Sequence, residues 1–280
     1  MTTDKPLVEL IRDRLAGDLR GLPVFHPVAV KIQQMLVSRD FRIEEVIRLI
    51  SEDQSLASQV LKVGNSSFYT GLSKVATIKD AVIRLGAQEI ANLVMMASQV
   101  EQYRSGTPVL DNAMQRLWDH ALSCATGARW LASKTGYSSL ETEAFMGGLL
   151  HDIGKLAIIK ALDEILQAGG TKANVSEILI NEILDTMHED VGHRLMSSWS
   201  LPESYCSITV NHHKTEYDGN DILLVIVRLA DLACRKTGKA LRPDPSVALA
   251  GASEAQFLGI KEITLAELEI IVEDAGIQAA

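Results

Sequence analysis

The spacing of the aliphatic residues is the feature that most limits what this chain can fold into. Apolar side chains recur at helical intervals through most of the 280 residues, as with Leu7, Ile11 and Leu15 near the N-terminus. This spacing places them on one face of an α-helix. No segment shows a convincing alternation of apolar and polar residues, which is the pattern of a β-strand. The sequence therefore predicts an all-α fold.

The composition supports this prediction and limits the range of partners. Apolar residues make up 47% of the chain but aromatic residues only 5%, so the expected core is aliphatic. Leu, Ala, Glu, Lys and Arg suit packed helices better than a β-sandwich. The net charge of -9 argues against broad binding of a nucleic-acid backbone, because no surplus of basic residues exists to replace its counterions.

The cysteines and the hydropathy favour a cytoplasmic protein. Cys124, Cys206 and Cys234 are odd in number and far apart, which fits a reducing compartment and no disulfide framework. No uncharged apolar run reaches the length of about 18 residues that predicts a membrane span. The first six residues lack the basic and then apolar order of a signal peptide.

The clearest break in the helical pattern is Ser105–Pro108, which contains poor helix formers and a proline. We expect an N-terminal helical part at 1–107, a helical core with a candidate site at 108–236, and a C-terminal helical tail at 237–280.

Several helix limits can be predicted from local signals. Asp53 or Ser55 is expected to cap one helix, and Thr77 to cap another that stops at Leu85-Gly86. The polar residues from His188 onward predict a break between a helix at 175–187 and another at 190–199.

The most informative short motif is His151-Asp152. An apolar stretch leads into this pair, and Gly154 and Lys155 follow it at once. A single His-Asp dipeptide is weak evidence of a site. It has companions here, because His120 lies upstream and His188, His212, His213 and Asp231 lie downstream on separate predicted helices or helix ends.

Imidazole and carboxylate groups together are typical ligands of zinc, iron, manganese and related ions. Adjacent helical residues point about 100° apart, so His151 and Asp152 could hold one ion only if partners approached from both sides. A carboxylate in the apolar helix around Asp231 is costly unless it is paired or metal-bound. The pattern predicts a metal site formed by all seven residues.

Each residue also has a simpler interpretation. His120, beside Asp119, could be a surface or structural histidine. His188 could begin a helix, and the His212-His213 pair could stabilise the C-terminal end of one.

Two charged residues have alternatives as well. Asp231 could pair with Arg228 or Arg235 at helical spacing. Lys155 could be a surface lysine after a helix end, or could bind a phosphate oxygen.

These residues resemble a known superfamily. The order His120, His151-Asp152, Asp231 is similar to that of the HD superfamily of metal-dependent phosphohydrolases, and His188, Gly192 and His212-His213 extend the similarity to its HD-GYP branch. Over about residues 20–215 the chain resembles the HDOD domain (HD-related output domain) in these motifs: Leu22-Pro23, Asp53-Gln54-Ser55-Leu56, Val60–Ser66, Ile78–Gly86 and Trp199-Ser200-Leu201-Pro202.

The resemblance implies an all-α protein with a multi-helix HD-domain-like core and an N-terminal helical subdomain. It implies one or two divalent transition-metal ions (Fe, Mn, Zn or Ni) on the seven residues, with Asp152 as the bridge and Lys155 beside the phosphate. The substrate would be a phosphomonoester, nucleotide or cyclic nucleotide.

HDOD proteins have often lost metal ligands and are thought to act in bacterial signalling. The resemblance therefore also implies an alternative role as a non-catalytic output module that binds a signalling protein, with a structural or vestigial metal site. This chain keeps all seven positions. It lacks Gly-Tyr-Pro after His212-His213, which argues against hydrolysis of cyclic di-GMP.

Overall fold

The computed structural model describes residues 5–38, 42–66, 74–169 and 175–275, and within these ranges it contains helices and no strand. The predicted all-α class is therefore confirmed. The N-terminal elements are α1 (Leu7–Ala16), η1 (Leu19–Gly21), α2 (Pro27–Ser38), α3 (Ile43–Glu52), α4 (Gln54–Gly64) and α5 (Ile78–Gln99).

The second half of the chain carries the longer helices. They are α6 (Pro108–Lys134), η3 (Ser138–Leu140), α7 (Glu141–Leu150), α8 (Ile153–Gln167), α9 (Glu177–Ser198), α10 (Glu203–Asn211) and α11 (Ile222–Lys236). The C-terminal elements are η4 (Leu249–Gly251), α12 (Ser253–Phe257) and α13 (Glu262–Ala275). None of the helices described is long and apolar enough to cross a membrane.

Local side-chain signals explain where several helices begin and bend. The Asp53 carboxylate accepts a hydrogen bond from the Leu56 N–H, and the Thr77 hydroxyl accepts one from the Asp80 N–H. Both are N-caps that satisfy free amides of the first turn. Gly86, with a φ of 80°, breaks the helical path inside α5, where the sequence predicts a stop.

One predicted helix break is wrong. Residues 177–198 form the single continuous helix α9, and His188 lies inside it rather than at its start. Its polar residues do not end the helix because they lie on different faces: His188 is buried whereas Asp190 is exposed.

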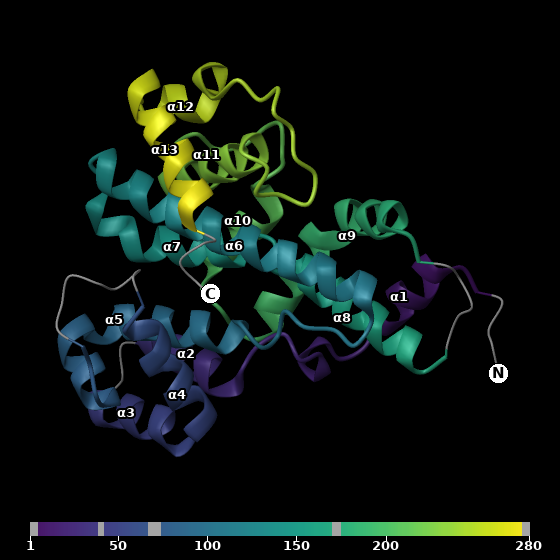
Figure 1. Ribbon diagram of the computed structural model, residues 1–280, viewed down its shortest axis with the longest axis horizontal. Coiled ribbons are helices and arrows are strands. Elements are labelled where there is room, and N and C mark those ends of the chain that lie inside the picture. The colour runs from purple at the N-terminus through teal and green to yellow at the C-terminus, as the bar shows by residue number, and fades with distance from the viewer. Residues whose placement is uncertain (1–4, 39–41, 67–73, 170–174, 276–280) are drawn as a thin grey trace.

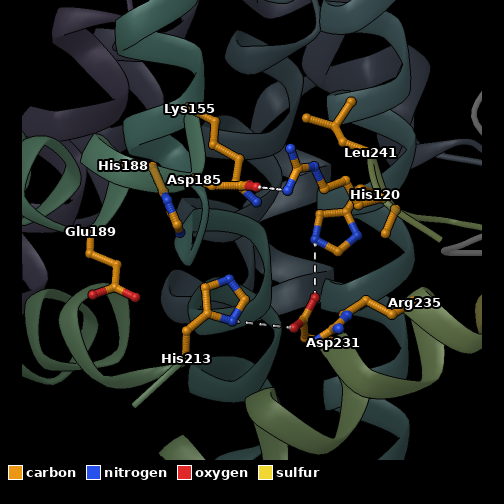
Figure 2. Close-up of a pocket in the computed structure, with 11 residues that line it drawn as sticks. His120, Lys155, Asp185, His188, Glu189, His213, Asp231, Arg235 and Leu241 are labelled. Carbon is orange, nitrogen blue, oxygen red and sulfur yellow. Dashed lines mark ion pairs between the residues drawn. The ribbon is translucent and has the colours of Figure 1, made fainter. Parts of the chain in front are cut away.

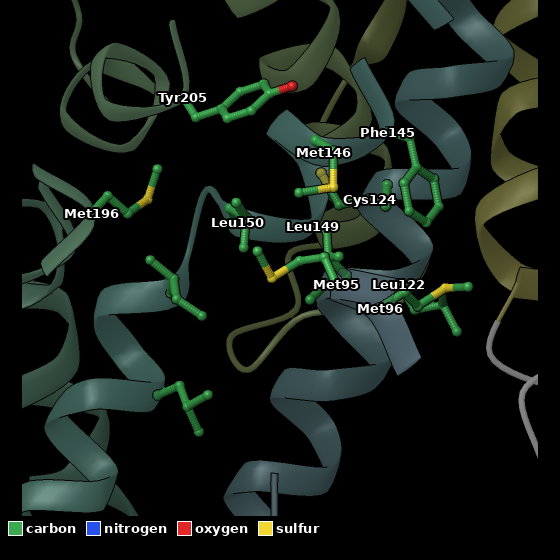
Figure 3. Packing of buried hydrophobic residues seen from close by; sticks show 14 of the residues in the cluster. Met95, Met96, Leu122, Cys124, Phe145, Met146, Leu149, Leu150, Met196 and Tyr205 are labelled. Carbon is green, nitrogen blue, oxygen red and sulfur yellow. The ribbon is translucent and has the colours of Figure 1, made fainter. Parts of the chain in front are cut away.

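The helices form two groups with one shared core. In Figure 1, α2 to α5 lie together below α6 and α7, whereas α1 lies at the other end of the molecule and contacts α8. Figure 3 shows Met95 of α5 packed among side chains of α6 and α7, including Cys124 and Phe145. The hydrophobic cluster thus continues across residue 107, and the division into three parts at 107 and 236 stays a proposal.

Two close helix crossings position the candidate site. A Cβ on Gly154 of α8 would lie 1.9 Å from the His188 carbonyl oxygen of α9. A Cβ on Gly148 of α7 would lie 2.7 Å from the Cα of Ala125 in α6. Glycine is therefore required at both crossings, which bring the ends of α7 and α8 against α6 and α9.

Candidate metal centre

All seven predicted ligands converge, although they come from six helices. His120 lies in α6, His151 follows α7, and Asp152 caps α8. His188 lies in α9, His212 and His213 follow α10, and Asp231 lies in α11. The ligand atoms form two groups, one of His120, His151 and Asp231 and the other of Asp152, His188, His212 and His213, each within 4.8 Å.

The first group surrounds one edge of the Asp152 carboxylate. The Nε2 atoms of His120 and His151 lie 3.1 Å apart. The Nε2 of His120 is 3.3 Å from both the Oδ2 of Asp152 and the Oδ1 of Asp231. Two nitrogens bound to one tetrahedral ion at about 2.0–2.1 Å would lie about 3.3 Å apart, so the spacing fits a shared ion.

The second group faces the other carboxylate oxygen. The Oδ1 of Asp152 lies 3.5 Å from the Nε2 of His188 and 3.3 Å from that of His212. These two nitrogens are 3.4 Å apart. Asp152 therefore presents one oxygen to each group, which is the geometry of a bridging carboxylate.

Backbone carbonyls orient four of the histidines. The Nδ1 atoms of His120 and His151 lie 2.8 Å from the Lys239 oxygen and 2.7 Å from the Gly148 oxygen. Those of His188 and His212 similarly face carbonyls of their own helices. An Nδ1–H donated to a carbonyl leaves the Nε2 lone pair facing the cluster, as in metal-bound histidines.

Burial and unsatisfied polar groups also fit a cation. Asp152 is 2% exposed, and its Oδ1 has no hydrogen-bond donor among the described residues. A buried carboxylate oxygen among neutral imidazoles lacks the compensation that burial demands. The donor set and the unpaired oxygen together fit a divalent transition metal.

The pKa values favour ionised carboxylates and two neutral histidines. Burial alone would raise the pKa of Asp231, but His120 and His151 lower it to about 2. Burial lowers the pKa of His188 to about 3 and that of His212 to about 4. These imidazoles are neutral near pH 7 and can donate lone pairs.

His120 behaves differently because two carboxylates face it. Burial alone would lower its pKa, but a hydrogen bond that its ring donates to Asp152 and the charges of Asp152 and Asp231 raise it to about 9. A metal ion that binds here must therefore displace a proton.

A cavity of about 310 Å³ opens above the cluster. Figure 2 shows His120, Lys155, His188, His213 and Asp231 around the cavity, with dashed lines from Asp231 to His120 and to His213. Among the described residues, the cavity is lined by His120, Lys155, Asp185, His188, Glu189, His213, Asp231, Arg235, Ala240, Leu241 and Arg242.

Lys155 is part of the site. It is 9% exposed, and its Nζ donates a hydrogen bond to the Oδ2 of Asp152 at 2.6 Å. The interpretation as a surface lysine is therefore wrong. Its position at the cavity wall allows contact with an anion held by the cluster.

The other simple interpretations fare differently. His120 is 2% exposed, so it is not a surface histidine. Asp231 lies beside His120 and pairs with neither arginine. Arg228 pairs with Glu254, and the carboxylate nearest to Arg235 is that of Asp244. His212 does cap the end of α10, yet its ring also faces Asp152.

The sequence patterns missed residues that shape the site from outside the ligand set. Arg228 donates hydrogen bonds to the carbonyls of Asn211, His212 and Lys214, which fixes the turn that carries His212 and His213. Arg242 lines the cavity. The only sequence signal for Arg228 was its position one turn before Asp231. No sequence signal indicated Arg242.

The fold and cluster define an all-helical protein with a buried His–Asp centre that could bind metal. The HDOD domain family matches residues 22–215, and the chain therefore belongs to the HDOD family. Asp231 and the cavity residues Arg235 and Arg242 lie beyond the matched segment.

Solved structures share the fold. An HDOD domain protein of unknown function from Geobacter sulfurreducens has a TM-score of 0.73 and 23% identity, covering 96% of each chain. A protein from Shewanella amazonensis, named as a candidate metal-dependent phosphohydrolase, has a TM-score of 0.63 and 16% identity, covering 96% of this chain and 99% of that one. A protein from Marinobacter aquaeolei, named as a candidate signal transduction protein, has a TM-score of 0.66 and 21% identity, covering 99% and 66%.

An uncharacterized protein of Treponema pallidum is 26% identical over 228 residues. The match covers 79% of this chain and 44% of the relative, so the matched segment spans less than half the length of that protein.

Proposed function

We propose that this protein is a metal-dependent phosphohydrolase with a signalling role, acting on a phosphomonoester, nucleotide or cyclic nucleotide. The observation that carries the proposal is the convergence of five histidines and two aspartates in two groups around Asp152. Four of the imidazoles are held by backbone carbonyls with Nε2 toward the cluster.

In this proposal, His120, His151 and Asp231 would hold one ion, and His188, His212 and His213 would hold a second. Asp152 would be a ligand common to both. Bound divalent ions supply Lewis acidity toward a phosphoryl oxygen and lower the pKa of a water nucleophile.

The chain's own residues bind and orient the substrate. Lys155 donates hydrogen bonds to a phosphate oxygen from the cavity wall, in place of or beside its contact with Asp152. The buried floor excludes bulk water, which strengthens these charged contacts. The cavity volume suits a small ligand, and the net charge of -9 argues against nucleic acid as a partner.

A second candidate function is a non-catalytic signalling output module, in which the metal site is structural or vestigial. The observation that favours it is the contact between α9 and the N-terminal helices. The carbonyl of Trp199 accepts a hydrogen bond from Gln34 of α2, and that of Ser198 accepts one from Arg20 of η1. The C-terminal end of the helix that carries His188 is thus joined to η1 and α2, through which a signalling partner would act in this alternative.

Three free cysteines in the described structure, all buried, favour a reducing compartment. We include a cytoplasmic location in the proposal on this ground.

Metal analysis of natively purified protein tests the first step. We expect one or two equivalents of Fe, Mn, Zn or Ni in the wild type, and none in the His151→Ala, Asp152→Ala double variant. His193→Ala is the matched control, because His193 lies on α9 outside the cluster. A wild-type protein that takes up no metal after loading would refute the metal centre.

Activity and partner binding separate the two functions. The enzyme proposal predicts hydrolysis of phosphate esters by metal-loaded wild type and by His193→Ala, but not by the double variant. Absence of hydrolysis across phosphomonoesters, nucleotides and cyclic nucleotides, with partner binding that the double substitution leaves unchanged, would support the output module instead.

A further inference from the structure

The mouth of the cavity carries arginines that the metal centre does not use. Arg235 belongs to α11, and Arg242 to the segment between α11 and η4. Both follow residue 215, where the family match ends. Most of the cavity lining, including Asp185 and Glu189, thus comes from the segment that matches the HDOD family, whereas both arginines come from the chain beyond it.

Arg242 is held by an exposed partner. Its Nη1 lies 2.5 Å from the Oδ2 of Asp185 on α9, and the two side chains are 57% and 44% exposed. Exposed ion pairs contribute little net stability. A phosphate or carboxylate of a ligand can therefore replace Asp185, because it offers the guanidinium an anionic oxygen like the Oδ2 of Asp185.

The backbone that carries Arg242 is fixed, so only its side chain needs to move. The carbonyl of Leu241 accepts a hydrogen bond from Arg116 of α6 at 2.8 Å. The carbonyl of Lys239 contacts the Nδ1 of His120 at 2.8 Å. The segment that orients a metal ligand therefore also presents Arg242 at the rim.

Arg235 is available to assist. Its nearest carboxylate among the described residues is that of Asp244, at 3.9 Å, which is too long for a hydrogen bond. At the cavity, Arg235 therefore has no hydrogen-bonded carboxylate among the described residues, whereas Arg242 has the exposed carboxylate of Asp185.

We propose that the cavity binds a small molecule with two separated anionic groups. Its phosphoryl group lies at the His–Asp cluster, and a second phosphate or carboxylate binds Arg242 at the rim in exchange for Asp185. This inference rests on the proposed function for the position of the phosphoryl group, and it makes Arg242 the residue that determines specificity.

Paired ligands test the inference by calorimetry on Mn-loaded protein. The probes are alkane diphosphonates with one to four carbons between the phosphonates, each compared with the alkyl monophosphonate of the same length. We expect the best diphosphonate to bind wild type about 10-fold or more tightly than its monophosphonate, as a charged hydrogen bond supplies.

Two substitutions predict opposite changes. Arg242→Ala should abolish the preference for the diphosphonate and leave monophosphonate affinity unchanged. Asp185→Asn should increase the preference, because it releases Arg242. Arg48→Ala, at an exposed ion pair on α3, is the control and should alter neither affinity.

A wild type without a diphosphonate preference, or an Arg242→Ala variant that weakens both ligands equally, would overturn the inference. Phosphate-ester hydrolysis without this preference would overturn the inference alone. An Arg242-dependent preference in a protein that hydrolyses no phosphate ester would support the inference and refute the enzymatic function.

Discussion

Gly154→Ala tests whether α8 and α9 must touch for His188 to reach Asp152. The added Cβ would lie 1.9 Å from the His188 carbonyl oxygen and 2.7 Å from the Gly192 nitrogen. Both are backbone atoms inside a helix, so neither can move alone. Ordinary contacts of a Cβ begin near 3.4 Å, and the two helices must therefore separate by about 1.5 Å.

The expected cost follows from two opposing effects. Overpacking costs about 1–3 kcal/mol, and a contact between two helix backbones belongs at the upper end of that range. Alanine regains up to about 1 kcal/mol over glycine through its helix propensity. We expect a net loss of about 2 kcal/mol, which lowers the melting temperature of a chain of this size by about 4–8 °C.

Thermal unfolding by circular dichroism measures this loss, with Gly147→Ala as the matched control. A Cβ on Gly147 meets only the side-chain ends of Ile208 and Val227, at 2.8 and 3.1 Å. These can rotate away, so the control should melt within about 2 °C of wild type. Gly154→Ala should also lose metal from the group that contains His188. If both variants melted alike and kept their metal, the close crossing would not position the site as argued.

Two further predictions concern Arg228 and Glu254, whose side chains pair at 2.7 Å. Arg228→Gln leaves the buried Glu254 carboxylate unpaired and frees the His212 carbonyl. We therefore expect the free energy of unfolding in urea to fall by about 3–5 kcal/mol, with weaker metal binding at His212 and His213. The control Arg48→Gln should change stability by less than about 0.5 kcal/mol, and equal effects of the two substitutions would contradict this role of Arg228. Burial alone would raise the pKa of Glu254, but hydrogen bonds from its own backbone N–H and from Arg228 lower it below its ordinary value of 4.5. The ionised pair therefore stabilises the fold above that pH and loses its contribution as the pH falls. Glu254→Gln should be less stable than wild type at pH 7, but its free energy of unfolding should decline less between about pH 5 and pH 3. Parallel declines of the two proteins in urea unfolding would refute this account.

Features that depend on one or two turns of chain were predictable from the sequence. Apolar residues at helical spacing indicated an all-α fold, and the caps Asp53 and Thr77 lie where predicted. These features are local because a cap bonds to amides two or three residues away. The break at His188 was wrong because the polar pattern alone did not show which face of α9 would be buried.

Part of the candidate site could also be predicted from residue types. The sequence identified seven possible ligands, because histidine and aspartate are unusual in apolar helices. It left open whether Asp231 would pair with Arg228, Arg235 or a histidine. That choice depends on where α6, α11 and α12 lie in space, and the structure shows Arg228 paired with Glu254 of α12.

Tertiary structure alone decided which side chains meet around His151-Asp152. His120 and Asp231 are 111 residues apart in sequence, yet the Nε2 of one lies 3.3 Å from the Oδ1 of the other. Gly148 and Gly154 permit the helix crossings that bring the ligands together. Helical periodicity specifies which face of a helix is buried, whereas the close packing of distant backbones determines which buried groups meet.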